Sequence, residues 1–179
     1  MKIALDVAQT CVEKAGCGWH ADALARAMAK EVGPNNLILY HQFGDWINSN
    51  TDKGIRLDEV ESPFLNKDLD EAKRLWKDIE SGLSPLPGTP DVVHSNSFMA
   101  PKIPNAKLVY TIHDLCFWTH PEFSSEHNRN LCQTQLLRAL THADAFHFIS
   151  RTTRNDFENI LPGWLEETRK PWSIIYSGC

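Results

Sequence analysis

The stretch Leu108-Val109-Tyr110-Thr111-Ile112-His113-Asp114-Leu115 decides the fold of this chain. Its apolar part is short and rich in β-branched or aromatic residues, which predicts a buried strand rather than a helix. In open parallel sheets, ligands bind in the crevice beyond the carboxyl ends of the strands. His113 and Asp114 follow this strand directly, so they are candidate site residues. The alternative, that His113 only caps the strand or bonds a nearby carbonyl, is equally compatible with these residues alone.

The size and charge of the chain exclude several classes of protein. Its 179 residues fit one domain with a sizeable core. A net charge of -5 argues against a nucleic-acid partner, whose binding surface is normally basic. There is no apolar run of roughly eighteen residues, which a membrane span requires. Residues 1–7 turn polar too soon for a signal peptide, so a cytoplasmic location is expected.

Cysteine and histidine spacing gives no sign of a disulfide or a metal. The five cysteines are odd in number, and no two form a Cys-x-x-Cys pair, which favours free thiols. The eight histidines include no His-Glu-x-x-His arrangement. We therefore expect neither a metal nor a cofactor.

Strand-like runs alternate with amphipathic helical runs along the chain, which predicts βα units. The expected strands are 2–7, 37–41, 91–94, 107–113, 145–149 and 172–176, with a weaker one near 54–60. The expected helices are 21–32, 68–79, 125–141 and 150–161, and the third of them turns Leu136, Leu137 and Leu140 inward. The fold class predicted is therefore α/β, a Rossmann-like parallel sheet flanked by helices, in a single domain of residues 1–179. The aperiodic segment 43–54 is expected to be mobile.

Polar residues follow several of the predicted strands. If the strands are parallel, their carboxyl ends share one edge, and that edge carries Asp6, His41, His94, Ser95, Asn96, His113, Asp114, Ser150 and Arg151. This clustering predicts a binding crevice there. The alternative is that residues leaving strands are polar simply because loops are solvated.

A glycine-rich turn, Gly16-Cys17-Gly18-Trp19-His20-Ala21, opens the first helix. It matches the Gly-x-Gly-x-x-Ala pattern of dinucleotide-binding proteins. However, residues 9–15 separate it from its strand, and Tyr40-His41-Gln42 offers no carboxylate for a ribose, which disfavours nicotinamide binding. A more general role remains, in which amides at the helix N-terminus approach a phosphate. A turn that only connects two elements is equally compatible with these six residues.

Four pieces of the chain together resemble a known family. They are the glycine loop leading into the first helix, residues 16–29; Pro90-Asp91-Val92-Val93-His94 with Pro101 after it; residues 109–115 with Pro121 after them; and residues 143–157, which contain Ser150-Arg151-Thr152-Thr153-Arg154-Asn155-Asp156. In this order and spacing they resemble the N-terminal domain of a GT-B glycosyltransferase of the retaining glycosyltransferase family 4. They cover nearly the whole chain. The closest resemblance is to bacterial mannosyl- and glucosyltransferases of polysaccharide assembly.

The resemblance implies specific roles for the candidate residues. Gly16 and Gly18 would face the diphosphate of a nucleotide-sugar donor, and His113 would contact the transferred sugar. Asp114 would orient that histidine or meet a saccharide or lipid-linked acceptor. Transfer would retain configuration without an essential metal, so preorganised amides and cations would stabilise the charge that grows on the leaving phosphates.

The resemblance also implies a second, C-terminal domain with a basic pair and a Glu-x7-Glu segment, and these 179 residues lack it. We therefore expect them to be an N-terminal half that transfers little or no sugar by itself. The family commonly contacts the inner face of the membrane through basic patches. Here Lys102 and Lys107 are isolated, so any such contact is expected to be peripheral.

Two other classes of function stay open. One is a non-catalytic α/β module that binds a carbohydrate or a phosphorylated ligand, and the other is a Rossmann oxidoreductase domain. Four aromatic residues near the expected crevice, Trp19, Trp46, Trp118 and Phe123, are candidates for stacking on an acceptor sugar. The alternative for these aromatic residues is core packing or an interface.

Overall fold

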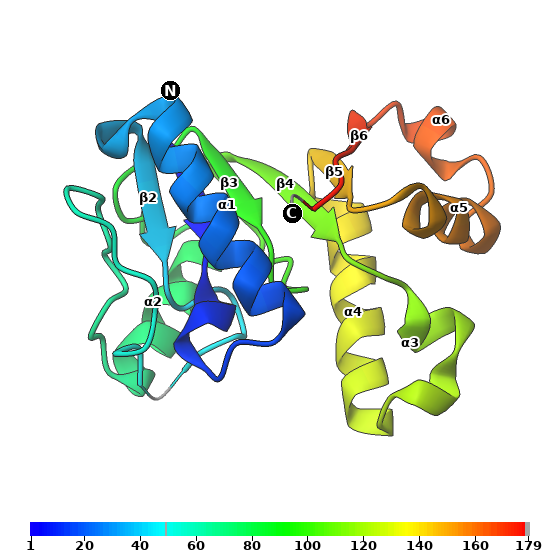
Figure 1. Ribbon diagram of the computed structural model, residues 1–179, viewed down its shortest axis with the longest axis horizontal. Coiled ribbons are helices and arrows are strands. Elements are labelled where there is room, and N and C mark those ends of the chain that lie inside the picture. Colours follow the sequence, from blue (N-terminus) through cyan, green and yellow to red (C-terminus); the bar gives the residue numbers. More distant parts are fainter. Residues whose placement is uncertain (49, 178–179) are drawn as a thin grey trace.

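The computed structural model describes residues 1–48 and 50–177 as an α/β domain (Figure 1). Its strands are β1 (Ile3–Asp6), β2 (Leu37–Tyr40), β3 (Val92–Ser95), β4 (Lys107–Ile112), β5 (Ala145–Phe148) and β6 (Trp172–Ile174). They form one sheet in the order β2-β1-β3-β4-β5-β6, and every neighbouring pair is parallel. The predicted Rossmann-like parallel sheet flanked by helices is confirmed.

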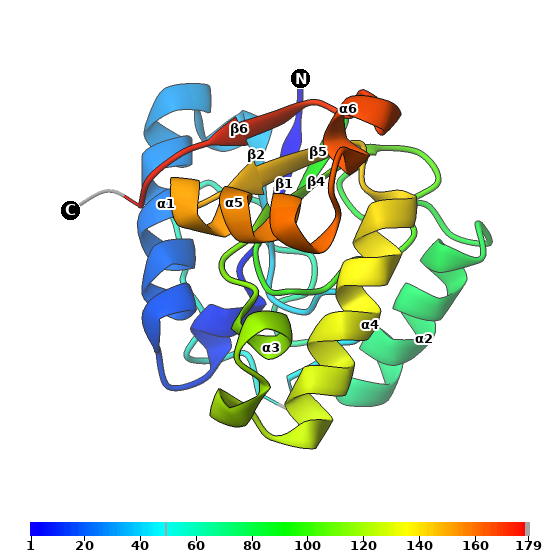
Figure 2. The ribbon, with the colours of Figure 1, turned by 90° about the vertical axis from the view of Figure 1, so that its right-hand side faces the viewer.

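Helices cover the two faces of the sheet unequally, with α1 on one side and α2 and α4 on the other (Figure 2). The longer helices are α1 (Gly16–Val32), α2 (Leu69–Glu80), α4 (Glu126–His142) and α5 (Arg151–Ile160), and α3 (Cys116–Thr119) and α6 (Trp164–Thr168) are short. The sequence explains three of their starts. Asp68, Ser125 and Ser150 each accept a hydrogen bond from a backbone N–H in the first turn of the helix that follows.

Alternation along the strands divides the apolar residues between two cores, because successive side chains point to opposite faces. The larger core packs strand residues such as Tyr110 and Phe148 against α2, α4 and α5. The smaller core packs Leu5 and Leu39 against Ala25 of α1. The larger core therefore runs across the sheet, whereas the face that α1 covers is packed mainly at β1 and β2.

Several boundary predictions were wrong. Residues 54–60 form no strand; only the adjacent Glu61 bonds the edge of β2, where its carbonyl accepts the Leu39 N–H (2.8 Å). The glycine-rich turn does open the first helix as predicted, since α1 begins at Gly16 and the glycines belong to its first turn. Leu137 is 55% exposed, because only one stripe of α4 faces the sheet.

The described residues leave out Ser49, Gly178 and Cys179. The predicted mobile segment 43–54 therefore lies outside them at Ser49, and the predicted free thiols lie outside them at Cys179. On either side of Ser49, the segment contains a tight turn and buried residues such as Thr51. The other four cysteines are free thiols. In the part of the chain that the structure describes, no helix is long and apolar enough to cross a membrane.

Candidate functional site

The topology places a crevice between the carboxyl ends of β1 and β3. After β1 the chain adds β2 on one side and β3 on the other, which makes this the switch point where open α/β sheets bind ligands. Asp6, at the end of β1, ties the two sides together, because its carboxylate accepts the backbone N–H groups of Ala8 (3.0 Å) and Asn96 (3.1 Å). Burial raises the pKa of Asp6 to about 6.

His113 leaves the end of β4 and points back into this crevice. Its Nε2–H donates to the carbonyl of Asn96 (3.0 Å), which fixes the ring and leaves Nδ1 as the acceptor nitrogen. The His113 carbonyl in turn accepts the hydroxyl of Thr153 on α5 (3.1 Å). Elements that follow β3, β4 and β5 therefore hold one imidazole in place.

Two aromatic rings enclose this histidine. The ring of His20, from α1, meets it edge-on with the centroids 5.5 Å apart, and Phe98 lies at the same distance in a tilted orientation. The resulting burial lowers the pKa of His113 to about 4, so the ring is neutral at physiological pH. Phe98 has a φ of 64°, a left-handed conformation that costs energy in a bulky residue and that clusters at functional sites.

The N-terminus of α1 opens toward the same crevice without a side-chain cap. Ala15 occupies the cap position and makes no side-chain hydrogen bond, and the first turn contains no acidic residue. The first intrahelical bond runs from Trp19 N–H to the Ala15 carbonyl, so the N–H groups of Gly16, Cys17 and Gly18 have no acceptor within the helix. Such a helix end binds anions readily.

The two glycines of this turn differ in what surrounds them. A Cβ on Gly18 would lie 2.8 Å from the backbone carbonyl oxygen of Gln9, so close packing against the 3₁₀ helix Ala8–Cys11 already requires a glycine there. A Cβ on Gly16 would meet no heavy atom of the described residues within 4 Å. Gly16 therefore has space beside it for a ligand, whereas Gly18 has a structural reason to lack a side chain.

Asp114 is exposed, unlike His113, and its charge acts on the thiol of Cys17 in the first turn of α1. Its Oδ1 accepts the backbone N–H of Cys116 (2.9 Å) at the start of α3. It also lines a cavity of about 290 Å³, here called the aromatic pocket, together with Trp46, Phe98, Phe117, Phe123 and Asn128. No hydrogen bond joins Asp114 to His113 among the described residues, so the geometry favours a role toward a ligand in this pocket over a role in orienting the histidine.

The four residues expected to line the acceptor cleft do not converge. Ser95 is fully buried and its hydroxyl donates to the Met99 carbonyl, so it has no surface for a ligand. The Ser150 hydroxyl caps α5, and Arg151 is exposed in the first turn of that helix. His94 lies on the face covered by α1, the opposite face from its neighbour Ser95.

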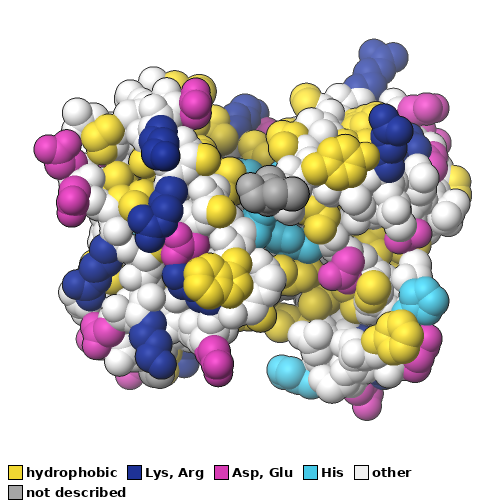
Figure 3. Space-filling view, viewed as in Figure 1, with side chains coloured by type: hydrophobic (Ala, Val, Ile, Leu, Met, Phe, Trp, Pro, Cys, Tyr) yellow, Lys and Arg dark blue, Asp and Glu magenta, His cyan; other side chains and the backbone are white. Residues whose placement is uncertain are grey.

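His94 belongs to a row of histidines beside α1. Its Nε2–H donates to the hydroxyl of Thr111 (2.7 Å), and this hydroxyl donates to Nδ1 of His147 (3.3 Å). The Nε2–H of His147 donates to the carbonyl of Ile175 (3.1 Å). The row borders a cleft of about 670 Å³, and Figure 3 shows histidine side chains in a hollow across the middle of this face. Burial lowers the pKa of His94 to about 3.

Sequence reasoning placed Asn96 at the edge of the sheet without giving it a role, and it did not assign His20 and Phe98 to the site. Both side-chain polar atoms of Asn96 are buried without a partner, as is Nε2 of His20, and unpaired buried polar atoms mark places where a ligand or water binds. Asn96 had a signal, because it follows β3 directly. His20 and Phe98 had none, since only the fold brings them to His113.

No three His, Cys, Asp or Glu side chains of the described residues gather closely enough to hold a metal ion. The family model of Glycosyltransferase Family 4 matches residues 15–176. The chain belongs to glycosyltransferase family 4. Neither a curated protein nor a solved structure matches it. Membership implies glycosyl transfer in general, with a sugar donor and an acceptor as substrates.

The family match includes most of the site described above, and only β1 with Asp6 and the 3₁₀ helix Ala8–Cys11 lie before it. It begins at Ala15, the cap position of α1, and it ends at Tyr176, beside the cleft next to α1. The matched residues therefore include the open end of α1, β3, β4 and β5.

Proposed function

We propose that this chain is the N-terminal, acceptor-side half of a GT-B glycosyltransferase. The complete enzyme would move a hexose of the mannosyl or glucosyl type, with retention, from a nucleotide-diphosphate sugar to a saccharide or lipid-linked acceptor. It would work in the cytoplasm or at the inner face of the membrane. The observation that carries the proposal is the uncapped N-terminus of α1 beside His113 at the switch point, within a family 4 match.

The proposed roles follow from the direction of each group. The free N–H groups of Gly16, Cys17 and Gly18 would bind the diphosphate and stabilise the charge that develops on it as the sugar leaves. The neutral ring of His113 would accept a hydroxyl of the transferred sugar at Nδ1. The second oxygen of Asp114 would accept a hydroxyl of an acceptor in the aromatic pocket.

One experiment tests the transfer reaction. The complete protein, including a second domain, is incubated with UDP-glucose or GDP-mannose and neutral saccharide acceptors, and the anomeric configuration of the product is read by NMR. We expect a retained configuration from the complete protein and little or no turnover from the 179 residues alone. Robust turnover by the 179 residues would show that they are not an isolated half.

The binding-module alternative makes a different prediction. The amides of α1 and the aromatic pocket suit a phosphorylated or saccharide ligand even without chemistry. Ligand binding by the complete protein without any transfer would favour this alternative. An oxidoreductase is disfavoured, because β2 is followed by buried His41 and Gln42 rather than by a carboxylate for a ribose.

Alanine at Gly16 or Gly18 should separate donor binding from packing. Gly18→Ala forces a Cβ against the Gln9 carbonyl and is expected to lower the free energy of unfolding by about 2 kcal/mol. Gly16→Ala meets no neighbour and is expected to keep or raise the melting temperature, since alanine favours helix. It should nevertheless raise the KM for the donor several-fold by crowding the diphosphate. An unchanged donor KM in Gly16→Ala would argue against the phosphate role of this turn.

A further inference from the structure

The aromatic pocket is bounded by two loops that are far apart in the sequence. One follows β2, where Phe43 and Trp46 exchange backbone hydrogen bonds of 3.0 and 2.9 Å around a tight turn with Asp45 at its tip. The other follows β3 and contributes Phe98 and Met99 to the lining. Trp46 on the first loop and Phe98 and Met99 on the second all line this space, so the positions of the two loops help to set its shape.

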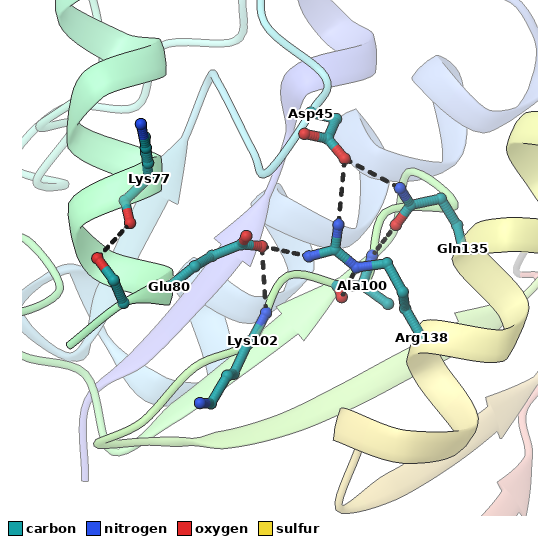
Figure 4. Close-up of polar contacts among 8 residues, drawn as sticks. Asp45, Lys77, Glu80, Ala100, Lys102, Gln135 and Arg138 are labelled. Carbon is teal, nitrogen blue, oxygen red and sulfur yellow. Dashed lines mark hydrogen bonds and ion pairs between the residues drawn. The ribbon is translucent and has the colours of Figure 1, made fainter.

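One buried side chain joins these two loops. Gln135 of α4 is 3% exposed; its Nε2 donates to Oδ2 of Asp45 (3.1 Å), and its Oε1 accepts the backbone N–H of Ala100 (2.9 Å). Figure 4 shows this amide between the loop that follows β2 and the loop that follows β3. A carboxamide suits the position, because it donates from one end and accepts at the other.

Arg138, one turn further along α4, reinforces the same connection. Its Nη1 lies 3.4 Å from Oδ2 of Asp45, its Nε donates to the carbonyl of Ala100 (3.2 Å), and its other Nη pairs with Glu80 of α2 (Figure 4). The arginine and Glu80 remain partly exposed, so their ion pair is screened by solvent. Gln135 is the buried member, and its loss would leave the Ala100 N–H unpaired inside the protein.

The lining of the pocket indicates which ligands fit. Asp114 is its single charged residue, and the other lining residues are aromatic, aliphatic, thiol, hydroxyl or amide side chains. A saccharide ring presents an apolar face to aromatic side chains and hydroxyl groups to a carboxylate. An anionic sugar would bring a second negative charge close to Asp114 with no cation in the lining to balance it, which disfavours binding.

We propose that Gln135 is a positioning residue that joins the loops after β2 and β3, and thereby sets the aromatic pocket to the width of one neutral saccharide ring. The inference rests on the proposed function, because the saccharide is its acceptor. It adds to that function a class of acceptor, neutral rather than acidic sugars. It also adds a role for Gln135, which would contact neither the donor nor the acceptor.

The test uses the 179-residue chain labelled with 5-fluorotryptophan, whose six tryptophans give separate ¹⁹F NMR signals. Trp46→Phe assigns the Trp46 signal, and Trp164, which packs against Phe146 and Phe157, serves as an internal reference. The probes are methyl α-glucopyranoside, methyl α-mannopyranoside and glucuronate. In the wild type we expect the two neutral glycosides to shift the Trp46 signal and glucuronate to leave it unchanged.

Substitutions at Gln135 test the connection itself. Gln135→Leu and Gln135→Glu should move or broaden the free Trp46 signal, leave Trp164 unchanged, and weaken neutral glycoside binding at least about fivefold. The double variant Asp45→Asn with Gln135→Glu restores the donor and acceptor pairing, because an asparagine amide donates to the glutamate, and it should bind within about twofold of wild type. Thr134→Leu, an exposed neighbour on α4, is the matched control.

Three results would overturn the inference. The first is an unchanged Trp46 signal in folded Gln135→Leu. The second is a double variant that binds neutral glycosides no more tightly than Gln135→Glu does. The third is a wild-type Trp46 signal that does not shift with neutral glycosides or that shifts equally with glucuronate. Sugar transfer by the complete enzyme is measured separately. Transfer can therefore be observed even if the Gln135 inference is wrong. The Trp46 signal of the ligand-free variants shows whether Gln135 joins the two loops even if no transfer is observed.

Discussion

Replacing His113 by alanine is expected to lower kcat/KM of the complete enzyme about a hundredfold, because the transferred sugar would lose the ring that positions it for reaction. The imidazole is held at the switch point by the Asn96 carbonyl and by the rings of His20 and Phe98. Its Nδ1 is left for a ligand. Loss of the ring removes one buried hydrogen bond, so the free energy of unfolding should fall by only about 1 to 3 kcal/mol.

The matched control for this variant is His147→Ala. His147 is also a buried histidine whose pKa is lowered by burial and which donates to a backbone carbonyl, that of Ile175, but it lies on β5 and has no hydrogen bond to the loop after β3 among the described residues. The two variants should show similar melting temperatures and very different turnover. Parallel losses of activity and melting temperature in His113→Ala, matched by His147→Ala, would identify His113 as a packing residue.

The sheet could be predicted from the sequence because its strands are buried. Short runs such as residues 107–113 are apolar or β-branched, and no helix of that length would bury them so completely. The segment 54–60 mixes apolar residues with the charged residues Arg56, Asp58 and Glu59, and it forms no strand. Its apolar side chains, Ile55 among them, pack against the core under α1 while the backbone runs past the edge of β2.

The site could be predicted only as an edge of the sheet, because neighbouring residues at a strand end point to opposite faces. His94 lies on the face of the sheet that α1 covers, and Ser95 is buried on the opposite face, so the two side chains do not line the same cleft. His113 and Asp114 also differ in their surroundings, because His113 contacts His20 of α1 and Asp114 lines the aromatic pocket.

The residues that enclose the crevice required the three-dimensional structure. Phe98 and His20 come from different βα units, and no spacing in the sequence relates either of them to His113. The pairing of Gln135 with Asp45 spans 90 residues, and it depends on the register between α4 and a loop. Contacts of this kind follow from tertiary packing, which local patterns do not encode.

Acidification should destabilise this fold well before its carboxylates titrate fully. Burial lowers the pKa of His94 to about 3 and of His113 to about 4, from an ordinary value of 6.5. Below pH 6.5 the unfolded chain binds protons at these positions and the folded chain does not, so stability is lost as the pH falls through this window. By linkage, each histidine is expected to contribute a loss of about 2 kcal/mol between roughly pH 7 and pH 5.

Asp6 opposes part of this loss. Its pKa is raised by burial from 3.8 to about 6, so its folded form binds a proton more readily than its unfolded form, and stability decreases as the pH rises from 3.8 to 6. Lowering the pH from about 7 to 5 therefore recovers roughly 1 kcal/mol at Asp6. The net loss of unfolding free energy expected from these three groups over this range is about 2 to 3 kcal/mol. Other histidines whose pKa is lowered by burial, His20, His41 and His147 among them, add to it.

His94→Asn isolates one contribution, because an asparagine amide still donates toward Thr111 but does not titrate. Urea unfolding at about pH 7 and pH 5 should show a pH-dependent loss in this variant that is smaller than that of the wild type by about 2 kcal/mol. His127→Asn, at an exposed position on α4, should keep the wild-type pH dependence. A His94→Asn variant with the full wild-type loss would mean that the acid sensitivity arises elsewhere.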